Sequence, residues 1–121
     1  KELAILHCVS GYPAPAEDYN LRTLVDMQQK FGLVTGLSDH TIDNTTAITS
    51  VALGASIIEK HVTLDRNGGG PDDSFSLESE ELKRLCTGAK TAWGSRKAEY
   101  GDFLTHNFSY YRVFPRPLTF I

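Results

Sequence analysis

The sequence lacks any run of about eighteen or more apolar residues, the length that a membrane-spanning helix needs. It also lacks a strong excess of either charge, because 12 Lys and Arg against 15 Asp and Glu leave a formal net charge of −3. Nucleic acid and an anionic membrane surface are therefore poor candidate partners. The apolar stretch within the opening KELAILHCVSGYP is too short for a secretory signal, so we expect a soluble, cytoplasmic protein.

Cysteine is equally scarce, with Cys8 and Cys86 the 2 that the chain contains. We expect both thiols to be reduced and buried rather than part of a disulfide framework, because one falls in an apolar strand and the other on the apolar side of a helix. What the chain does have is 121 residues with 40% hydrophobic and 22% charged content. This is enough for one globular domain with a core.

The order of apolar segments predicts an α/β fold. Three short apolar runs predict buried strands, at residues 3–9, 33–37 and 56–63. Helical periodicity predicts three helices, at residues 21–31, 43–55 and 82–93, with Asp43 as a cap and Gly32 and Gly94 as stops. Strand and helix in alternation predict parallel strands joined by right-handed crossovers. Three strands leave open sheet edges, so the unit looks incomplete.

The last part of the sequence differs in composition. Residues 95–121 are aromatic and basic, contain two prolines and show no clear period. We therefore expect one α/β region at 1–94 and a linker or an approach to another domain at 95–121.

Polar residues collect where the expected strands end: Ser10 and Tyr12, then Ser38, Asp39 and His40, then Glu59 and His61. The carboxyl ends of parallel strands share one rim, and active sites form at that rim. We therefore expect these residues, far apart in the sequence, to converge.

His40 and His61 can each offer an imidazole nitrogen to a divalent metal, while Asp39, Glu59 and Asp72 could orient the rings or act on bound water. Two protein ligands would leave positions open for a substrate oxygen. The spacing is no metal-binding helix signature, so a metal pair and two core histidines are equally open from the residues alone.

The other histidines have plainer interpretations. His7 lies inside the first expected strand, where we expect a hydrogen-bonded core histidine, and His106 lies in the aperiodic tail, where we expect it to be solvated. The glycines at 68–70 could cradle a phosphate but lack the lysine and strand context of a P-loop, so we favour a loop over the rim.

Four segments together resemble one family. LHCVSGYPAP, GLSDHT, GASIIEKHVTLDR and GGPDDSFSLES, in this order, resemble the sialic acid synthase family, which includes pseudaminic and legionaminic acid synthases and spore coat polysaccharide proteins. The resemblance implies the last three βα units of a TIM (β/α)8 barrel, as a truncated fragment. It also implies that residues 95–121 lead towards an antifreeze-like domain that is absent.

Family members condense phosphoenolpyruvate with an N-acetylated amino sugar aldehyde, and full-length members are expected to be homodimers. The resemblance implies that His40 and His61 are metal ligands, with Mn²⁺ as the ion, and that Ser38 contacts phosphoenolpyruvate. The phosphate-binding lysines of the family have no counterpart here, and Lys60 does not match them. We therefore expect the isolated chain to be inactive.

The resemblance also implies residues for the sugar and for proton transfer. Tyr12 and Asp72 match residues that line the sugar site, and Glu59 matches a carboxylate beside the metal. Either Glu59 or Asp72 would be the general base. Ser10 stands where some members have asparagine at a phosphoenolpyruvate contact, and Asp73 replaces a histidine of many relatives, with a bearing on which sugar is accepted.

Two other interpretations stay open. The chain could belong to another metal-assisted barrel of the aldol type. It could also be a non-catalytic module that needs a partner, or copies of itself, to cover its sheet edges. The sequence does not identify the amino sugar.

Overall fold

The computed structural model describes residues 2–96 and 119–120, so His106 and the other tail residues from 97 to 118 lie outside the described residues. The elements in chain order are β1 (Ala4–Cys8), η1 (Ala16–Tyr19), α1 (Thr23–Phe31), β2 (Val34–Asp39), α2 (Thr45–Ala52), β3 (Ile57–Lys60), η2 (Asp73–Phe75), α3 (Ser79–Ser95) and β4 (Thr119–Phe120). Within these residues no helix is both long and apolar enough to cross a membrane.

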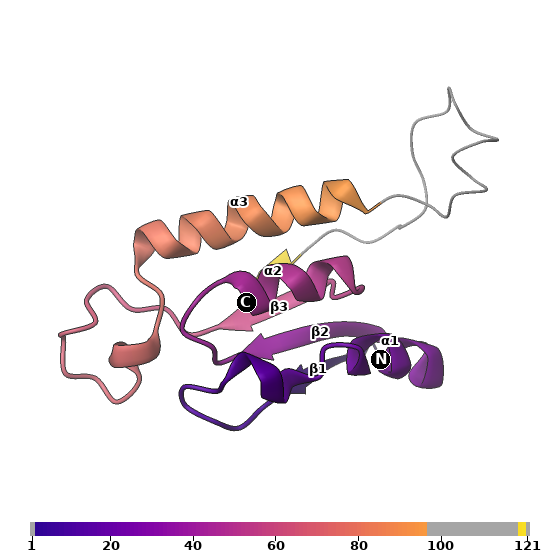
Figure 1. Cartoon of the computed structure of the whole chain (residues 1–121), viewed down its shortest axis with the longest axis horizontal. Coiled ribbons are helices and arrows are strands. Elements are labelled where there is room, and N and C mark those ends of the chain that lie inside the picture. Colours follow the sequence, from indigo (N-terminus) through magenta and orange to yellow (C-terminus); the bar gives the residue numbers. More distant parts are fainter. Residues whose placement is uncertain (1, 97–118, 121) are drawn as a thin grey trace.

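The strands form one parallel sheet in the order β1-β2-β3-β4 (Figure 1). The predicted α/β order of parallel strands and helices is confirmed. β4 comes from the tail, and it pairs with β3 through Ile57 and Thr119. Two residues are too few for an alternating pattern, so this strand could not be predicted from the sequence.

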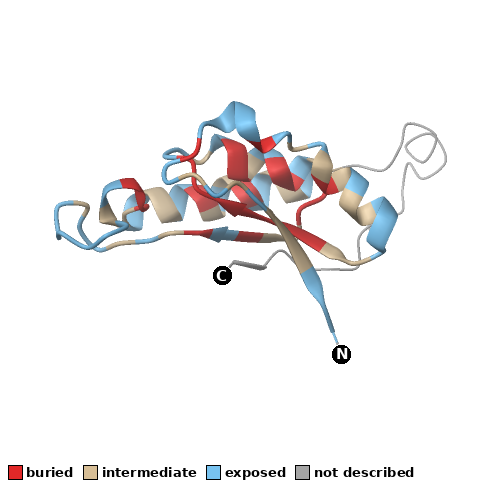
Figure 2. Cartoon of the chain, turned by 90° about the horizontal axis from the view of Figure 1, so that it is seen from below, coloured by how far each residue is buried: buried red, intermediate tan, exposed pale blue. Residues whose placement is uncertain are grey.

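The helices cover one face of the sheet (Figures 1 and 2). Because side chains alternate along a strand, Leu37 and Ile58 are buried on this covered face, whereas Ser38 and Glu59 belong to the opposite face. Cys8 is the register partner of Ser38 and shares that opposite face. It is exposed, so the expectation of a buried thiol at Cys8 is wrong.

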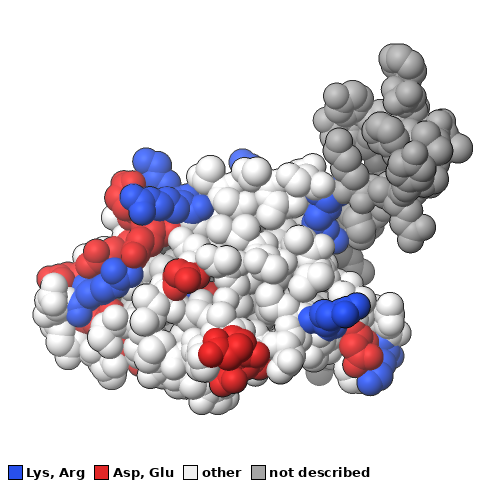
Figure 3. Space-filling view, in the orientation of Figure 1, with Lys and Arg blue, Asp and Glu red and all other residues white. Residues whose placement is uncertain are grey.

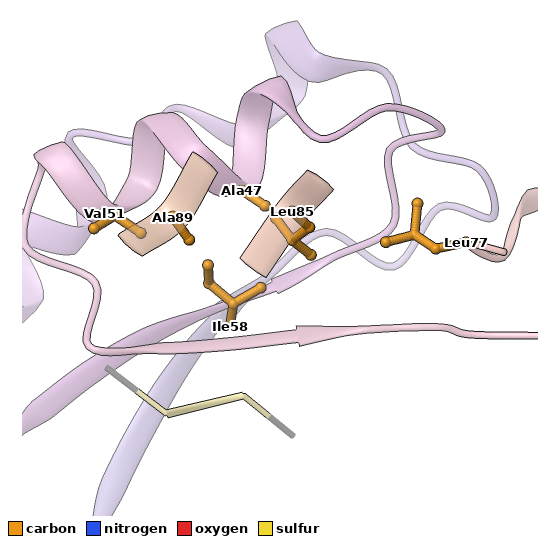
Figure 4. Close-up of a cluster of buried hydrophobic side chains, with 6 residues drawn as sticks. All are labelled: Ala47, Val51, Ile58, Leu77, Leu85 and Ala89. Atoms are coloured by element: carbon orange, nitrogen blue, oxygen red, sulfur yellow. The ribbon is translucent and has the colours of Figure 1, made fainter. Parts of the chain in front are cut away.

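The main core lies between β3 and the helix pair α2 and α3 (Figure 4). Its buried members are Ala47, Val51, Ile58, Leu77, Leu85 and Ala89. Burying each Leu, Ile or Val contributes roughly 1.5–3 kcal/mol. The two helices approach closely at Gly88, where an added Cβ would lie 2.5 Å from Cδ1 of Ile48. A side chain at this crossing would therefore displace the end of the Ile48 side chain.

The helix ends follow the sequence signals in part: α3 runs through Gly94, the predicted stop, to Ser95, and the N-cap position of α2 is Asn44 rather than Asp43. Gly32 ends α1 in the left-handed conformation with φ of 61°, as predicted. Asp43 Oδ1 accepts a hydrogen bond from the Thr45 N–H at 2.7 Å at the start of α2. α3 begins before residue 82, because Glu78 and Glu81 form a capping box.

Charged side chains of both signs lie side by side on the face seen in Figure 3, in keeping with the small net charge. Lys30 and Asp26, one turn apart on α1, form an exposed ion pair at 2.9 Å. Such surface pairs contribute only about 0–1 kcal/mol. The ion pair of Lys60 with Asp39 is different, because both side chains are buried.

Candidate active site at the carboxyl ends of the strands

Two tripeptides, residues 38–40 and 59–61, lie side by side at the carboxyl ends of β2 and β3. Ser38 pairs in register with Glu59, and the next pair is the last of the ladder. The Ser38 hydroxyl donates to Oε1 of Glu59 at 2.7 Å. His40 and His61 each come one residue after the ladder ends, on the same side as Ser38 and Glu59 by alternation. The predicted convergence of these strand ends is confirmed.

His40 is buried and held from three directions. Its backbone N–H donates to the Tyr19 hydroxyl at 2.6 Å, and its carbonyl accepts the Ala14 N–H at 3.0 Å. Its ring Nδ1 lies 2.8 Å from the carbonyl oxygen of Val9. A carbonyl oxygen can only accept, so Nδ1 carries the proton and Nε2 is left with a lone pair. This is the tautomer that a metal-binding imidazole requires.

His61 faces His40 across a short gap. The two ring centroids are 5.4 Å apart. The His61 carbonyl accepts the Leu77 N–H at 2.9 Å, which fastens this residue to the segment that leads into α3. Its Nδ1 lies 3.8 Å from Oδ2 of Asp72, too far for a hydrogen bond but close enough for the carboxylate to face the ring.

Two aromatic rings flank the histidines. The Tyr12 ring centroid lies 4.2 Å from that of His40 and 6.0 Å from that of His61. Phe75, at the end of η2, lies 5.4 Å from the His61 ring and 5.8 Å from the Tyr12 ring. The sequence analysis missed Phe75, because a single aromatic residue in a polar loop carries no periodic signal. Together the rings form an apolar wall beside the imidazoles.

The histidine pair is the candidate place for a divalent ion among the described residues. One ion could contact both rings at the roughly 2.0–2.1 Å that imidazole nitrogens keep from a metal, because the rings are neighbours and His40 Nε2 has a lone pair. In the part of the chain that the structure describes, no cluster of three or more His, Cys, Asp and Glu side chains could hold a metal.

Asp39 and Lys60 point to the opposite face of the sheet from the rings. Oδ2 of Asp39 lies 2.7 Å from Nζ of Lys60, and Thr41 donates to both carboxylate oxygens. Asp39 therefore does not contact the histidine rings, and it does not reach water bound beside them as expected, because alternation turns its side chain towards the helices.

The loop from 65 to 73 is fastened at several points. Asp73 accepts hydrogen bonds from the Thr63 hydroxyl and the Gly70 N–H, both at 2.7 Å. The Thr63 hydroxyl, followed by the Gly70 N–H, lowers the pKa of Asp73. Arg66 forms an ion pair with Glu81, and this contact lowers the pKa of the Glu81 carboxyl. Asp73 thus shapes the loop that carries Asp72.

The remaining predicted residues lie on the same rim with more solvent contact. Ser10 is exposed just after β1, Tyr12 is 55% exposed, and the Asp72 side chain is 54% exposed. Glu59 is exposed next to Ser38. His7 is confirmed as a hydrogen-bonded structural histidine, since its Nε2 donates to the Tyr19 carbonyl at 2.5 Å.

Tyr19 is a second residue that the sequence analysis missed. Its side chain is fully buried, and its hydroxyl receives the His40 N–H. Burial raises the pKa of Tyr19 to about 12 despite the opposing hydrogen bond from His40, and the charge of Asp39 adds to the rise. Nothing in the local sequence EDYN distinguishes this tyrosine from an exposed one.

The chain is similar to known synthases along most of its length. The model of the NeuB family matches residues 1–99. N,N'-diacetyllegionaminic acid synthase of Campylobacter jejuni is 47% identical over 72% of this chain and 26% of its own length. Pseudaminic acid synthase of the same species is 38% identical over 97% of this chain and 34% of its own length. The chain thus spans about a quarter to a third of these relatives.

A solved structure agrees with the sequence matches. The N-acetylneuraminic acid synthetase of Leptospira borgpetersenii, determined in complex with citrate, superimposes with a TM-score of 0.72 at 33% identity. The match covers 87% of this chain and 40% of that chain. The expected βα units of a TIM barrel are confirmed.

Proposed function

Because the chain belongs to the NeuB family, we propose that it supplies the metal-binding rim of a synthase that condenses phosphoenolpyruvate with an N-acetylated amino sugar. Carbon 3 of phosphoenolpyruvate would bond to the sugar aldehyde carbon, water would add at carbon 2, and phosphate would leave. The products are a nonulosonic acid of the sialic type and inorganic phosphate.

The observation that carries the proposal is the pair of neighbouring imidazoles at the ends of β2 and β3. Their ring centroids are 5.4 Å apart, and the Val9 carbonyl fixes the proton of His40 on Nδ1. A divalent ion held here would polarise the aldehyde oxygen and orient the carbonyl towards the enol carbon. We propose Mn²⁺ from the family resemblance, because imidazole donors by themselves accept several divalent metals.

The remaining rim residues receive roles from their positions. Ser38 holds Oε1 of Glu59, so we assign Oε2 of Glu59 the task of accepting a proton from the attacking water. Asp72, whose carboxylate faces His61, would bind sugar hydroxyls. Tyr12 would line the sugar site and exclude water from one side of the imidazoles.

The phosphate of phosphoenolpyruvate needs a cationic partner, and the strand ends that the structure describes do not offer a free one. The lysine nearest to the imidazoles in sequence, Lys60, has its ammonium group bound to Asp39 and to the Thr41 carbonyl. We therefore propose that residues outside this chain hold the phosphate, and that the isolated chain binds metal without catalysing the reaction.

Calorimetric titration of the folded chain with Mn²⁺, Mg²⁺ and Zn²⁺ tests the metal site. His40→Ala and His61→Ala should each abolish binding at one site per chain. His7→Ala is the matched control, because that ring already donates to Tyr19 on the covered face. Metal binding that survives both site variants would contradict the proposal.

A chimera tests the reaction. Residues 1–96 would replace the matching segment of the Campylobacter legionaminic acid synthase, and phosphate release would be followed with phosphoenolpyruvate and several N-acetylated amino sugars. Phosphate release that depends on His61 and on sugar supports the function. A folded chimera that binds metal but releases no phosphate with any sugar would contradict it.

A further inference from the structure

The ion pair of Lys60 and Asp39 is the most deeply buried charged group at the strand ends among the described residues. The side chains are 4% and 0% exposed, and Nζ lies 2.7 Å from Oδ2. Nζ also donates to the Thr41 carbonyl at 2.5 Å. Thr41 in turn donates its N–H to Oδ1 at 2.9 Å and its hydroxyl to Oδ2 at 3.1 Å. Both charges are thus fully provided with partners.

Stability alone is a weak explanation for this pair. Removing two charges from water carries a large desolvation cost, and apolar residues of similar size often serve a core equally well. A buried ion pair does, however, hold the two backbone segments that carry it in one relative position. Here those backbones are two adjacent strands of the sheet.

The position of the pair in the ladder connects it to the histidines. Asp39 and Lys60 are register partners and form the last pair between β2 and β3. His40 and His61 follow immediately, beyond the last paired residues of β2 and β3. Each histidine is otherwise fastened to a different neighbour, His40 to Tyr19 and His61 to Leu77. The Lys60–Asp39 pair is the last register pair between the two strands before the two histidines.

We propose that Lys60 and Asp39 are positioning residues that set the separation and relative orientation of the His40 and His61 rings. The proposal rests on the proposed function in taking these rings as the metal ligands. It assigns Lys60 a role on the covered face of the sheet, behind the rim, and not a role in holding phosphate. Thr41 completes the brace because it contacts both charged groups.

The test is a charge-neutral double variant, Asp39→Asn with Lys60→Met, which removes the ion pair without leaving one charge buried alone. Thermal unfolding should show a folded protein. Affinity for Mn²⁺ should fall by about 10- to 100-fold, the range seen when groups that orient metal ligands are lost. The matched control is Asp26→Asn with Lys30→Met, which removes an exposed pair and should leave the affinity unchanged.

A second readout needs no metal. Nitrogen-15 spectra of the imidazoles report the tautomer and the exchange broadening of each ring in the metal-free chain. The double variant should broaden or shift His40 and His61 while His7, bound to Tyr19, stays as it is. If the double variant does not fold, Thr41→Val, which removes the hydroxyl bond to Oδ2 of Asp39 and leaves the two charges paired, replaces it in both measurements.

The outcomes separate the two proposals. If the Asp39→Asn, Lys60→Met variant folds and its Mn²⁺ affinity and imidazole spectra are unchanged, the positioning role is overturned and the ion pair is only structural. If His40→Ala fails to alter metal binding, the proposed function fails. The metal-free spectra then still decide whether the pair positions the rings.

Discussion

Replacing Tyr19 by phenylalanine removes a single oxygen from behind His40. That oxygen accepts the His40 N–H at 2.6 Å, and the tyrosine side chain has no solvent exposure. Phenylalanine keeps the ring in the core but leaves a buried N–H without an acceptor, which costs about 1–3 kcal/mol. We therefore expect Tyr19→Phe to lower the free energy of unfolding by this amount at pH 8.

The difference between wild type and variant should shrink at alkaline pH. Burial raises the pKa of Tyr19 from 10.0 to about 12. Because the folded pKa lies above the unfolded one, the neutral phenol stabilises the fold fully below pH 10 and loses this contribution as the pH rises towards 12. The loss is about 1.4 kcal/mol by pH 11, and the phenylalanine variant cannot undergo it.

Urea unfolding followed by circular dichroism at pH 8, 10 and 11 measures both effects. Tyr12→Phe is the matched control, because that side chain is 55% exposed, and its stability should stay within about 0.5 kcal/mol of wild type. Equal stabilities of wild type and Tyr19→Phe at pH 8, or a gap that is the same at pH 8 and 11, would refute the reasoning.

Three further changes give separate expectations. Gly36→Ala should lower the free energy of unfolding in urea by about 1–3 kcal/mol, because its Cβ would lie 2.6 Å from the Ile57 carbonyl oxygen; a variant as stable as wild type would contradict this. Asp73→Asn should lose less stability than wild type as the pH falls below 3.8. Thr63 lowers the pKa of Asp73 in the folded state, so the carboxylate stabilises the fold above the unfolded pKa of 3.8, and this contribution is lost as the pH falls through the folded pKa. Parallel acid unfolding curves of the two proteins would exclude this. In the chimera, Asp72→Asn should raise the Michaelis constant for the sugar more than that for phosphoenolpyruvate, and equal effects on both would remove Asp72 from the sugar site.

The sequence predicted β1, β2 and β3 because each is a short apolar run followed by a helix of regular period, although no residue of β1 is buried. It predicted the third strand too long. Residues 61–63 leave the sheet, since Val62 bridges to Leu77 and the Thr63 N–H donates to the Leu77 carbonyl at 2.9 Å. In the sequence, an apolar residue such as Val62 is compatible with a longer strand, because the pattern does not show which segment its backbone pairs with.

The candidate site was predictable only in its residue types. Strand ends gave Ser38, His40, Glu59 and His61, because parallel topology places those ends together. Tyr19 and its contact with His40 could not be predicted, since the two residues are 21 positions apart and share no period. The burial of Lys60 is the reverse case, because a lysine in a sequence normally indicates a solvated position.

In the two tripeptides at the ends of β2 and β3, the middle residues pair on the helix-covered face and the outer residues lie on the opposite face. Both sets of contacts require the same register between the strands. A slip of one residue between the strands would set Lys60 against a neighbour of Asp39 rather than against Asp39 itself, and would leave a buried carboxylate without its cation. The same slip would carry Glu59 away from Ser38 and His61 out of step with His40. The buried pair on one face therefore penalises the same misalignment that would separate the imidazoles on the other, so the register that satisfies the core is also the register that brings the candidate ligands together.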